Sequence, residues 1–107
     1  MKVLHLVLKK KWYDMIATGQ KTEEYRSITS YWGSRLIEGW LDFGNGVFRV
    51  YKDFDAICFH LGYTKHTMMF ECLGIKIGTG VLEWGAESDK RYYIISIGKR
   101  LNQEEKL

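Results

Sequence analysis

The chain has 107 residues, of which 46% are apolar and 27% charged, a composition typical of one soluble domain with a single core. The net charge of +3 permits contact with nucleic acid without requiring it, because dedicated nucleic-acid binders usually carry denser basic clusters. No apolar run is long enough to cross a bilayer, and no signal-peptide cleavage pattern follows the first run, so we expect a cytoplasmic single domain over residues 1–107 that does not contact membranes.

The first two predicted elements are a strand at Val3–Leu8 and a helix at Lys10–Thr18. Trp12 and Ile16 are four residues apart within the helix, so they share one face of it. Gly19 suits the left-handed position that commonly follows a helix end, because it has no Cβ to clash. The chain is therefore expected to leave the helix and turn at Gly19.

A charged segment with a two-residue period follows this turn. Thr22, Glu24 and Arg26 face one side of an extended chain, Tyr25 faces the other, and Lys21 lies at the bend. If Lys21 turns toward Glu24 and Arg26, a carboxylate between two cations stays ionised and holds both in place. Two interpretations stay open, namely a solvated edge strand with alternating charges and a polar cluster that faces a cleft.

The next predicted unit is a short helix over Tyr31–Ile37, capped by Thr29 or Ser30. Trp32 shares a face of this helix with Leu36, a spacing that is more typical of a core residue. Aromatic side chains beside cations also form the pockets on which bases stack, so a stacking role for Trp32 is the alternative.

The remainder of the chain is rich in strand patterns. A hairpin is expected from strands Trp40–Phe43 and Val47–Tyr51, because Asn45 and Gly46 form a turn signal between them. His60 ends a predicted central strand, where it is either a core residue or a pocket residue. Further expected elements are strands at Asp55–Leu61, Met68–Ile77 with a bulge at Gly74, and Arg91–Ile97, a turn at Gly78–Gly80, and a charged tail over Lys99–Leu107.

The cysteines and histidines give no metal-binding pattern in the sequence. Cys58 and Cys72 each lie inside an apolar strand pattern, which predicts two buried free thiols, although a disulfide stays open. No Cys-x-x-Cys occurs, and His5, His60 and His66 lack ligand spacing, so we expect neither a metal nor a cofactor.

Gly19, Lys21, Glu24 and Arg26 match the pattern Gly-x-Lys-x-x-Glu-x-Arg. This pattern resembles the signature of the ASCH family (activating signal cointegrator homology), a branch of the PUA-like superfamily, in its small single-domain bacterial or phage type. The resemblance covers essentially the whole chain, including the order of strand, helix and motif and the later run Phe59–Tyr63. It implies a PUA-like small β-barrel with two short helices near the N-terminus, whereas periodicity alone predicts only a strand-rich α+β fold.

The resemblance also implies a cleft beside the barrel that recognises RNA or a modified nucleotide or nucleoside. Lys21 and Arg26 would contact phosphate or a base edge, and Glu24 would accept from an exocyclic amine. Tyr25 and Trp32 would stack on bases, and family members place a loop like the one after Phe59–Tyr63 near the cleft. The expected binding residues are Lys21, Glu24, Arg26, Tyr25, Trp32, Arg35, His60, Tyr63 and Lys65.

Two other functions stay open. Some small ASCH proteins act as amidohydrolases on acetylated cytidine or are linked to RNA cleavage, which implies Lys21 as a proton acceptor and Thr22 as a hydroxyl nucleophile. This chain departs from those hydrolases because it carries Glu24 where they carry threonine. The third function is a protein-interaction domain with a protein partner, as in the coactivator that gives the family its name.

Overall fold

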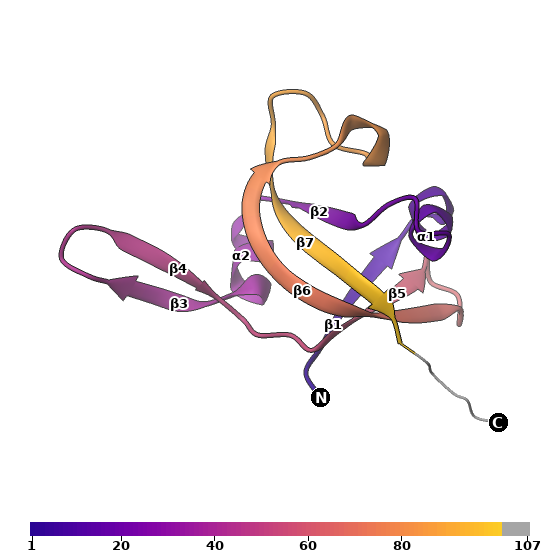
Figure 1. Ribbon diagram of the computed structural model, residues 1–107, viewed down its shortest axis with the longest axis horizontal. Coiled ribbons are helices and arrows are strands. Elements are labelled where there is room, and N and C mark those ends of the chain that lie inside the picture. The colour runs from indigo at the N-terminus through magenta and orange to yellow at the C-terminus, as the bar shows by residue number, and fades with distance from the viewer. Residues whose placement is uncertain (102–107) are drawn as a thin grey trace.

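Five strands form one curled sheet in the computed structural model, which describes residues 1–101 (Figure 1). Across the sheet the strands are β1 (Val3–Leu8), β5 (Ala56–Leu61), β6 (Thr67–Thr79), β7 (Arg91–Arg100) and β2 (Glu23–Ser27). β1 and β5 run parallel, and the other neighbouring strands pair antiparallel. The fold is strand-rich α+β, with the sheet curled into a half-barrel and two helices beside it.

The inner face of this sheet carries the core, and buried and exposed side chains alternate along its edge strand β1. Leu6 is fully buried there, whereas its neighbours His5 and Val7 are exposed. β5 lies between β1 and β6, and Phe59 on it is paired with Met68 on β6 inside the same apolar cluster. The prediction that this strand is central is therefore confirmed.

β6 and β7 form a long curved ribbon that crosses the molecule (Figure 1). Gly74 has a φ of +136°, and the strand register shifts beside it, so the predicted bulge is confirmed. The predicted turn at Gly78–Gly80 is wrong, because Gly78 and Thr79 continue β6 and pair with the start of β7. Cross-strand pairing outweighs the glycine signal at this place.

β7 also runs further than the sequence pattern suggests. Lys99 and Arg100 were expected in the charged tail but belong to β7, and Arg100 pairs with Phe70. Residues 102–107 of the expected tail lie outside the described residues.

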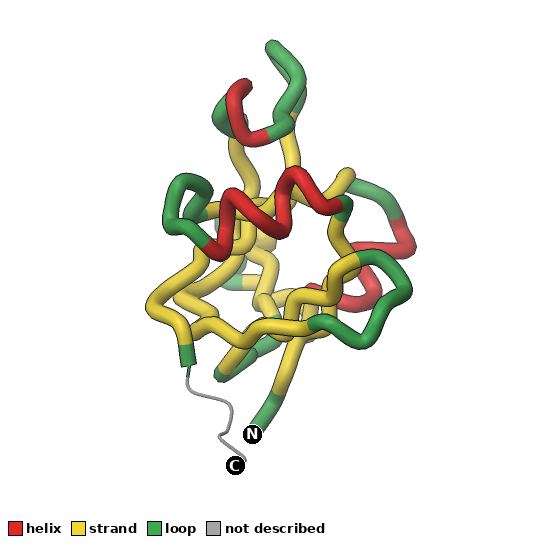
Figure 2. The backbone as a smooth tube through the Cα atoms, turned by 90° about the vertical axis from the view of Figure 1, so that its right-hand side faces the viewer, coloured by secondary structure: helices red, strands yellow, loops and turns green. Residues whose placement is uncertain are grey.

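β1 and β2 are the two edges of the sheet, and no backbone pairing joins them among the described strands. α1 (Lys10–Ala17) connects them and lies across the curled sheet in Figure 2. Ile16 anchors this helix in the core. The chain turns after the helix at Gly19, which has a φ of +84°, as expected. The open side of the half-barrel therefore lies between the two strands that α1 links.

α2 (Ser30–Leu36) follows β2 and closes the core with Leu36, which is fully buried. The predicted cap is confirmed, because the Thr29 hydroxyl accepts a hydrogen bond from the backbone N–H of Trp32 at 3.3 Å. A short 3-10 turn, η1 (Leu82–Trp84), lies between β6 and β7. No helix in the described part of the chain is long and apolar enough to cross a membrane.

β3 (Ile37–Asp42) and β4 (Val47–Tyr51) form the predicted hairpin, which projects from the body at the left of Figure 1. β3 starts three residues earlier than expected. The outer part of the hairpin is solvated, and its apolar side chains Trp40, Leu41 and Phe43 are at least half exposed. The hairpin is thus an extension of the fold that adds little to the core.

Candidate functional site

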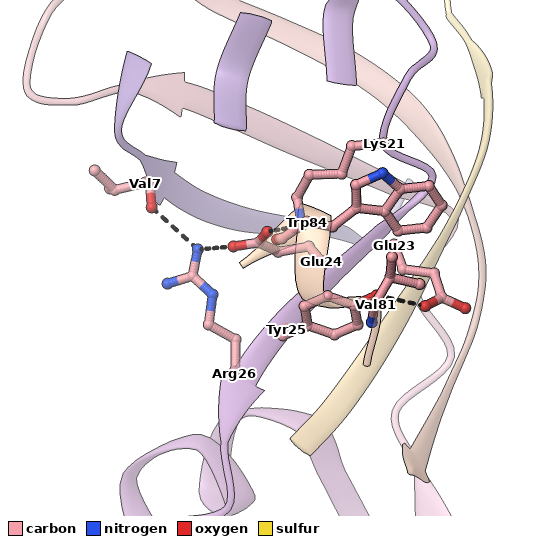
Figure 3. A network of polar contacts seen from close by, with 8 residues as sticks. All are labelled: Val7, Lys21, Glu23, Glu24, Tyr25, Arg26, Val81 and Trp84. Carbon is pink, nitrogen blue, oxygen red and sulfur yellow. Dashed lines mark hydrogen bonds and ion pairs between the residues drawn. The ribbon is translucent and has the colours of Figure 1, made fainter. Parts of the chain in front are cut away.

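Lys21 lies at the buried end of the charged motif and is only 1% exposed. Its ammonium donates a hydrogen bond to the Trp84 carbonyl at 2.8 Å and lies 3.2 Å from Glu24 Oε1 (Figure 3). The rings of Trp12 and Tyr25 lie 5.3 and 4.6 Å from Nζ, within cation–π distance. Side chains of α1 and β2 and a carbonyl of η1 therefore enclose this ammonium.

The local fold explains why Lys21 turns inward. After the turn at Gly19, the Lys21 N–H donates to the Met15 carbonyl at 3.1 Å, which draws the backbone against the end of α1. Burial lowers the pKa of Lys21, and the neighbouring Glu24 carboxylate opposes that shift. A lysine placed in this way is part of the folded interior and does not face solvent.

Glu24 and Arg26 continue the network toward the open side of the half-barrel. Arg26 Nη2 donates to Glu24 Oε2 at 2.8 Å and to the Val7 carbonyl at 3.0 Å (Figure 3). Val7 belongs to β1 and Arg26 to β2, so one guanidinium links the two unpaired sheet edges. The guanidinium also lies 4.9 Å from the centre of the Trp32 ring. Within the described chain, the buried Arg26 Nε has no hydrogen-bond partner.

Tyr25 points to the opposite side of β2, as the two-residue period predicts. Its hydroxyl donates to Glu23 Oε1 at 2.7 Å and accepts from the Val81 N–H at 3.0 Å. Burial raises the pKa of this hydroxyl, and the hydrogen bond from Val81 acts in the opposite direction. Tyr25 therefore ties the segment before η1 to the motif.

A groove of about 720 Å³ lies beside Arg26, and its lining combines cations with aromatic rings. The lining residues, which define the cationic groove, are Lys2, Val3, Leu4, His5, Val7, Arg26, Tyr31, Trp32, Arg35, Lys52, Phe54 and Tyr63. Four of these side chains are cations, and no described carboxylate is among them. The Arg35 guanidinium lies 4.2 Å from the Tyr31 ring centre, so cation and aromatic ring are already paired.

A second groove, of about 540 Å³, lies on the other side of Arg26 and Trp32. Its lining, which defines the motif groove, is Val7, Leu8, Lys9, Trp12, Glu24, Tyr25, Arg26, Ser27, Trp32 and Tyr92. The two grooves share Val7, Arg26 and Trp32. The stacked Arg26 and Trp32 side chains therefore form the ridge between two concave surfaces.

The structure brings together part of the predicted site. Arg26, Trp32, Arg35 and Tyr63 line the cationic groove, and Glu24, Tyr25, Arg26 and Trp32 line the motif groove. Trp32 also packs against the core, so both interpretations of this residue hold in part.

Four other predicted residues lie apart from the grooves. Lys21 is enclosed by protein, and Thr22 and Lys65 are exposed outside both linings. His60 is half-buried and also lies outside them, 2.9 Å from a histidine of β1. Lys21 and Thr22 therefore do not meet as a base and a nucleophile in either groove.

Sequence reasoning did not include Tyr31 on α2 among the binding residues, and it missed three groove residues that lie outside the helices, Lys2, Lys52 and Phe54. Lys2 precedes β1 and the other two follow β4, so only the pairing of β1 with β5 brings them near Arg26. No local signal marks them.

The structure also groups potential metal ligands that sequence spacing did not reveal. His5 comes from β1, and Cys58 and His60 come from β5, more than fifty residues later. Both cysteines are free, with Cys58 buried and Cys72 half-buried.

Comparison of this chain with models of known protein families, with curated proteins and with solved structures finds no match.

Proposed function

We propose that the cationic groove binds a single-stranded RNA segment or a nucleotide. The observation that carries this proposal is the groove lining, in which four cations and four aromatic side chains stand without a carboxylate among the described residues. Cations contact phosphates and aromatic faces stack on bases, and this combination is the recurrent chemistry of single-strand recognition.

The exposed aromatic side chains of the groove suit base stacking. Tyr31 is 56% exposed and Tyr63 is 98% exposed, so neither ring is used by the core. Trp32 meets Tyr31 edge to face, with ring centres 5.2 Å apart, and thereby holds one of these rings in place. A base that inserts beside them would bury aromatic surface that is now in water.

Two of the four groove cations pair with a carboxylate, Arg26 with Glu24 at 2.8 Å and Lys2 with Glu38. The Lys2–Glu38 pair is 3.9 Å long, and both side chains are more than half exposed. An exposed ion pair of this kind has a small interaction free energy and is screened by salt. Lys52 donates a hydrogen bond to the Ser34 carbonyl at 3.3 Å. Among the described residues, Arg35 and Lys52 form no ion pair, so their charges remain available to a phosphate.

The proposed fold identity agrees with this function. A strand-rich half-barrel with the motif Gly19, Lys21, Glu24 and Arg26 at its open side is similar to a PUA-like ASCH domain, in which a cleft beside the barrel receives RNA or a nucleoside. We propose that identity on the motif and on the order of elements.

Binding of a labelled single-stranded RNA of about ten nucleotides, followed by fluorescence anisotropy, tests the proposal. Arg35→Glu and Lys52→Glu should each weaken binding at least about tenfold, because each reverses a charge in the groove. Arg91→Glu is the matched control, since Arg91 is exposed outside both grooves. Equal losses in all three variants, or no binding by the parent protein, would contradict the proposal.

Amide hydrolysis of an acylated nucleoside is a second candidate, favoured by the lowered pKa of Lys21 beside Glu24. The enclosure of Lys21 leaves its ammonium out of both groove linings, so binding stands first. Incubation with N4-acetylcytidine and chromatography for cytidine tests this candidate. Release of cytidine that is lost in Thr22→Val would establish it, and absence of release by the parent would remove it.

A further inference from the structure

Three side chains with metal-binding chemistry share the outer face of the half-barrel. In the parallel pair of β1 and β5, His5 is opposite Cys58 and Val7 is opposite His60. Residues two apart on a strand point the same way, so His60 follows Cys58 on the same face. The core residues Leu6 and Phe59 occupy the opposite face.

The donor atoms of these side chains lie close together. His5 Nδ1 is 2.9 Å from His60 Nε2, and the two ring centres are 5.2 Å apart. One nitrogen from each ring and the Cys58 sulfur all lie within 4.8 Å of one another. Two rigid adjacent strands supply all three groups, so the cluster does not depend on a loop.

We propose that His5, Cys58 and His60 form a binding site for Zn²⁺ with an open fourth coordination position. Imidazole nitrogen and thiolate sulfur are the preferred ligands of Zn²⁺, and three protein ligands with one exchangeable position are typical of open zinc sites. The cluster contains no carboxylate, which disfavours Mg²⁺ and Ca²⁺.

The geometry requires only small side-chain movements. Zn–N bonds of about 2.0–2.1 Å in a tetrahedral site place two nitrogens roughly 3.3 Å apart, close to the 2.9 Å between His5 and His60. His5 is exposed at a sheet edge, so its ring has room to turn toward the buried Cys58. Coordination displaces the thiol proton of Cys58, which passes to the buffer. The proton shared by the two imidazole rings moves to the ring nitrogen that faces away from the metal.

The proposed zinc site lies next to the cationic groove. His5 also lines the cationic groove, so a metal bound here would lie at the edge of that groove. The zinc proposal does not rest on RNA binding, because its evidence is the donor cluster alone.

Titration of the reduced, metal-free full chain with Zn²⁺ by calorimetry, and with Co²⁺ by absorption, tests the site. We expect one Zn²⁺ per chain, a thiolate-to-Co²⁺ charge-transfer band, and visible bands of a tetrahedral ion. Zn²⁺ should also raise the melting temperature. Mg²⁺ should give neither heat nor stabilisation.

Variants identify the ligands. His5→Ala and Cys58→Ser should each weaken Zn²⁺ binding at least about tenfold, and Cys58→Ser should also abolish the charge-transfer band. His66→Ala and Cys72→Ser are matched controls, because both residues lie outside the cluster and should leave affinity unchanged. His5 is exposed, so His5→Ala keeps the test valid if Cys58→Ser fails to fold.

Absence of Zn²⁺ binding by the parent chain would overturn the proposal. Unchanged affinity in folded His5→Ala, or an equal loss in Cys72→Ser, would also overturn it, because either result would place the metal elsewhere.

Discussion

The two ends of the charged motif have different surroundings although they are only five residues apart. Lys21 is 1% exposed and its ammonium is enclosed by a carbonyl, a carboxylate and two rings. The side chain of Arg26 is 17% exposed and lines two grooves while it links β2 to β1. Glu24 lies between them and contacts both.

This difference shows that one charged pattern serves two purposes. The turn at Gly19 directs Lys21 inward, and the straight strand that follows directs Arg26 to the open side. The Lys21 end is enclosed by the fold, and we assign a structural role to it and ligand contact to the Arg26 end and the groove beside it. Variants at each end of the motif test this assignment.

The largest effect is expected for Lys21→Ala. Removal of the lysine side chain leaves a cavity and leaves Glu24 Oε1 without its cation, whereas Glu24 Oε2 keeps its pair with Arg26, so the free energy of unfolding should fall by about 2–5 kcal/mol. Urea denaturation measures this change. Lys10→Ala is the control, because the exposed Lys10–Asp14 pair should change stability by no more than about 0.5 kcal/mol. Similar stability of the two variants would contradict a structural role for Lys21.

The next effect concerns the exposed aromatic rim of the cationic groove. Tyr63→Ala should weaken RNA binding by about fivefold or more, the lower end of the range for base stacking, without a change in melting temperature. Phe43→Ala on the hairpin, where the aromatic side chain is 65% exposed, should leave affinity unchanged. Anisotropy titrations of both variants decide whether stacking occurs in the groove or on the hairpin.

A smaller effect is expected in the salt dependence of binding. If Arg35 contacts one phosphate, Arg35→Ala should reduce the slope of log K against log salt by about 0.7. Titrations at several salt concentrations measure the slope. An unchanged slope would show that Arg35 makes no phosphate contact.

The smallest effect is a pH dependence of stability that arises from Lys21. Its pKa is lowered in the folded state, so between that value and the ordinary 10.5 the unfolded chain holds more protons. The free energy of unfolding should therefore rise with pH across this window, relative to Lys21→Met, in which the titrating group is absent. Denaturation of both proteins at increasing pH tests the sign, and a fall relative to Lys21→Met would contradict it.

Local patterns predicted most elements of the fold. Apolar residues on both faces identified the central strand, and Gly74 and Thr29 marked the bulge and the helix cap correctly. Gly78 was misassigned to a turn because its pairing with Tyr92 on β7 is a long-range contact that glycine content does not show. Short-range signals were therefore reliable where no distant strand competed with them.

The site was less predictable, because its parts come from distant places in the chain. The burial of Lys21 depends on the carbonyl of Trp84, sixty-three residues later. The charge pattern therefore identified the motif but not which of its ends faces solvent. The cluster of His5 with Cys58 likewise depends on a parallel strand pair that has no spacing signature.

The four tryptophans offer the most direct test of the central claim, because their indole N–H signals report on separate regions. Trp32 forms the ridge between the grooves, Trp12 lines the motif groove, Trp40 lies on the hairpin and Trp84 caps Lys21. Titration of the ¹⁵N-labelled protein with single-stranded RNA should shift the Trp32 signal and leave those of Trp40 and Trp84 in place. A shift of the Trp40 or Trp84 signal with Trp32 unmoved would contradict ligand binding at the Arg26 end of the motif.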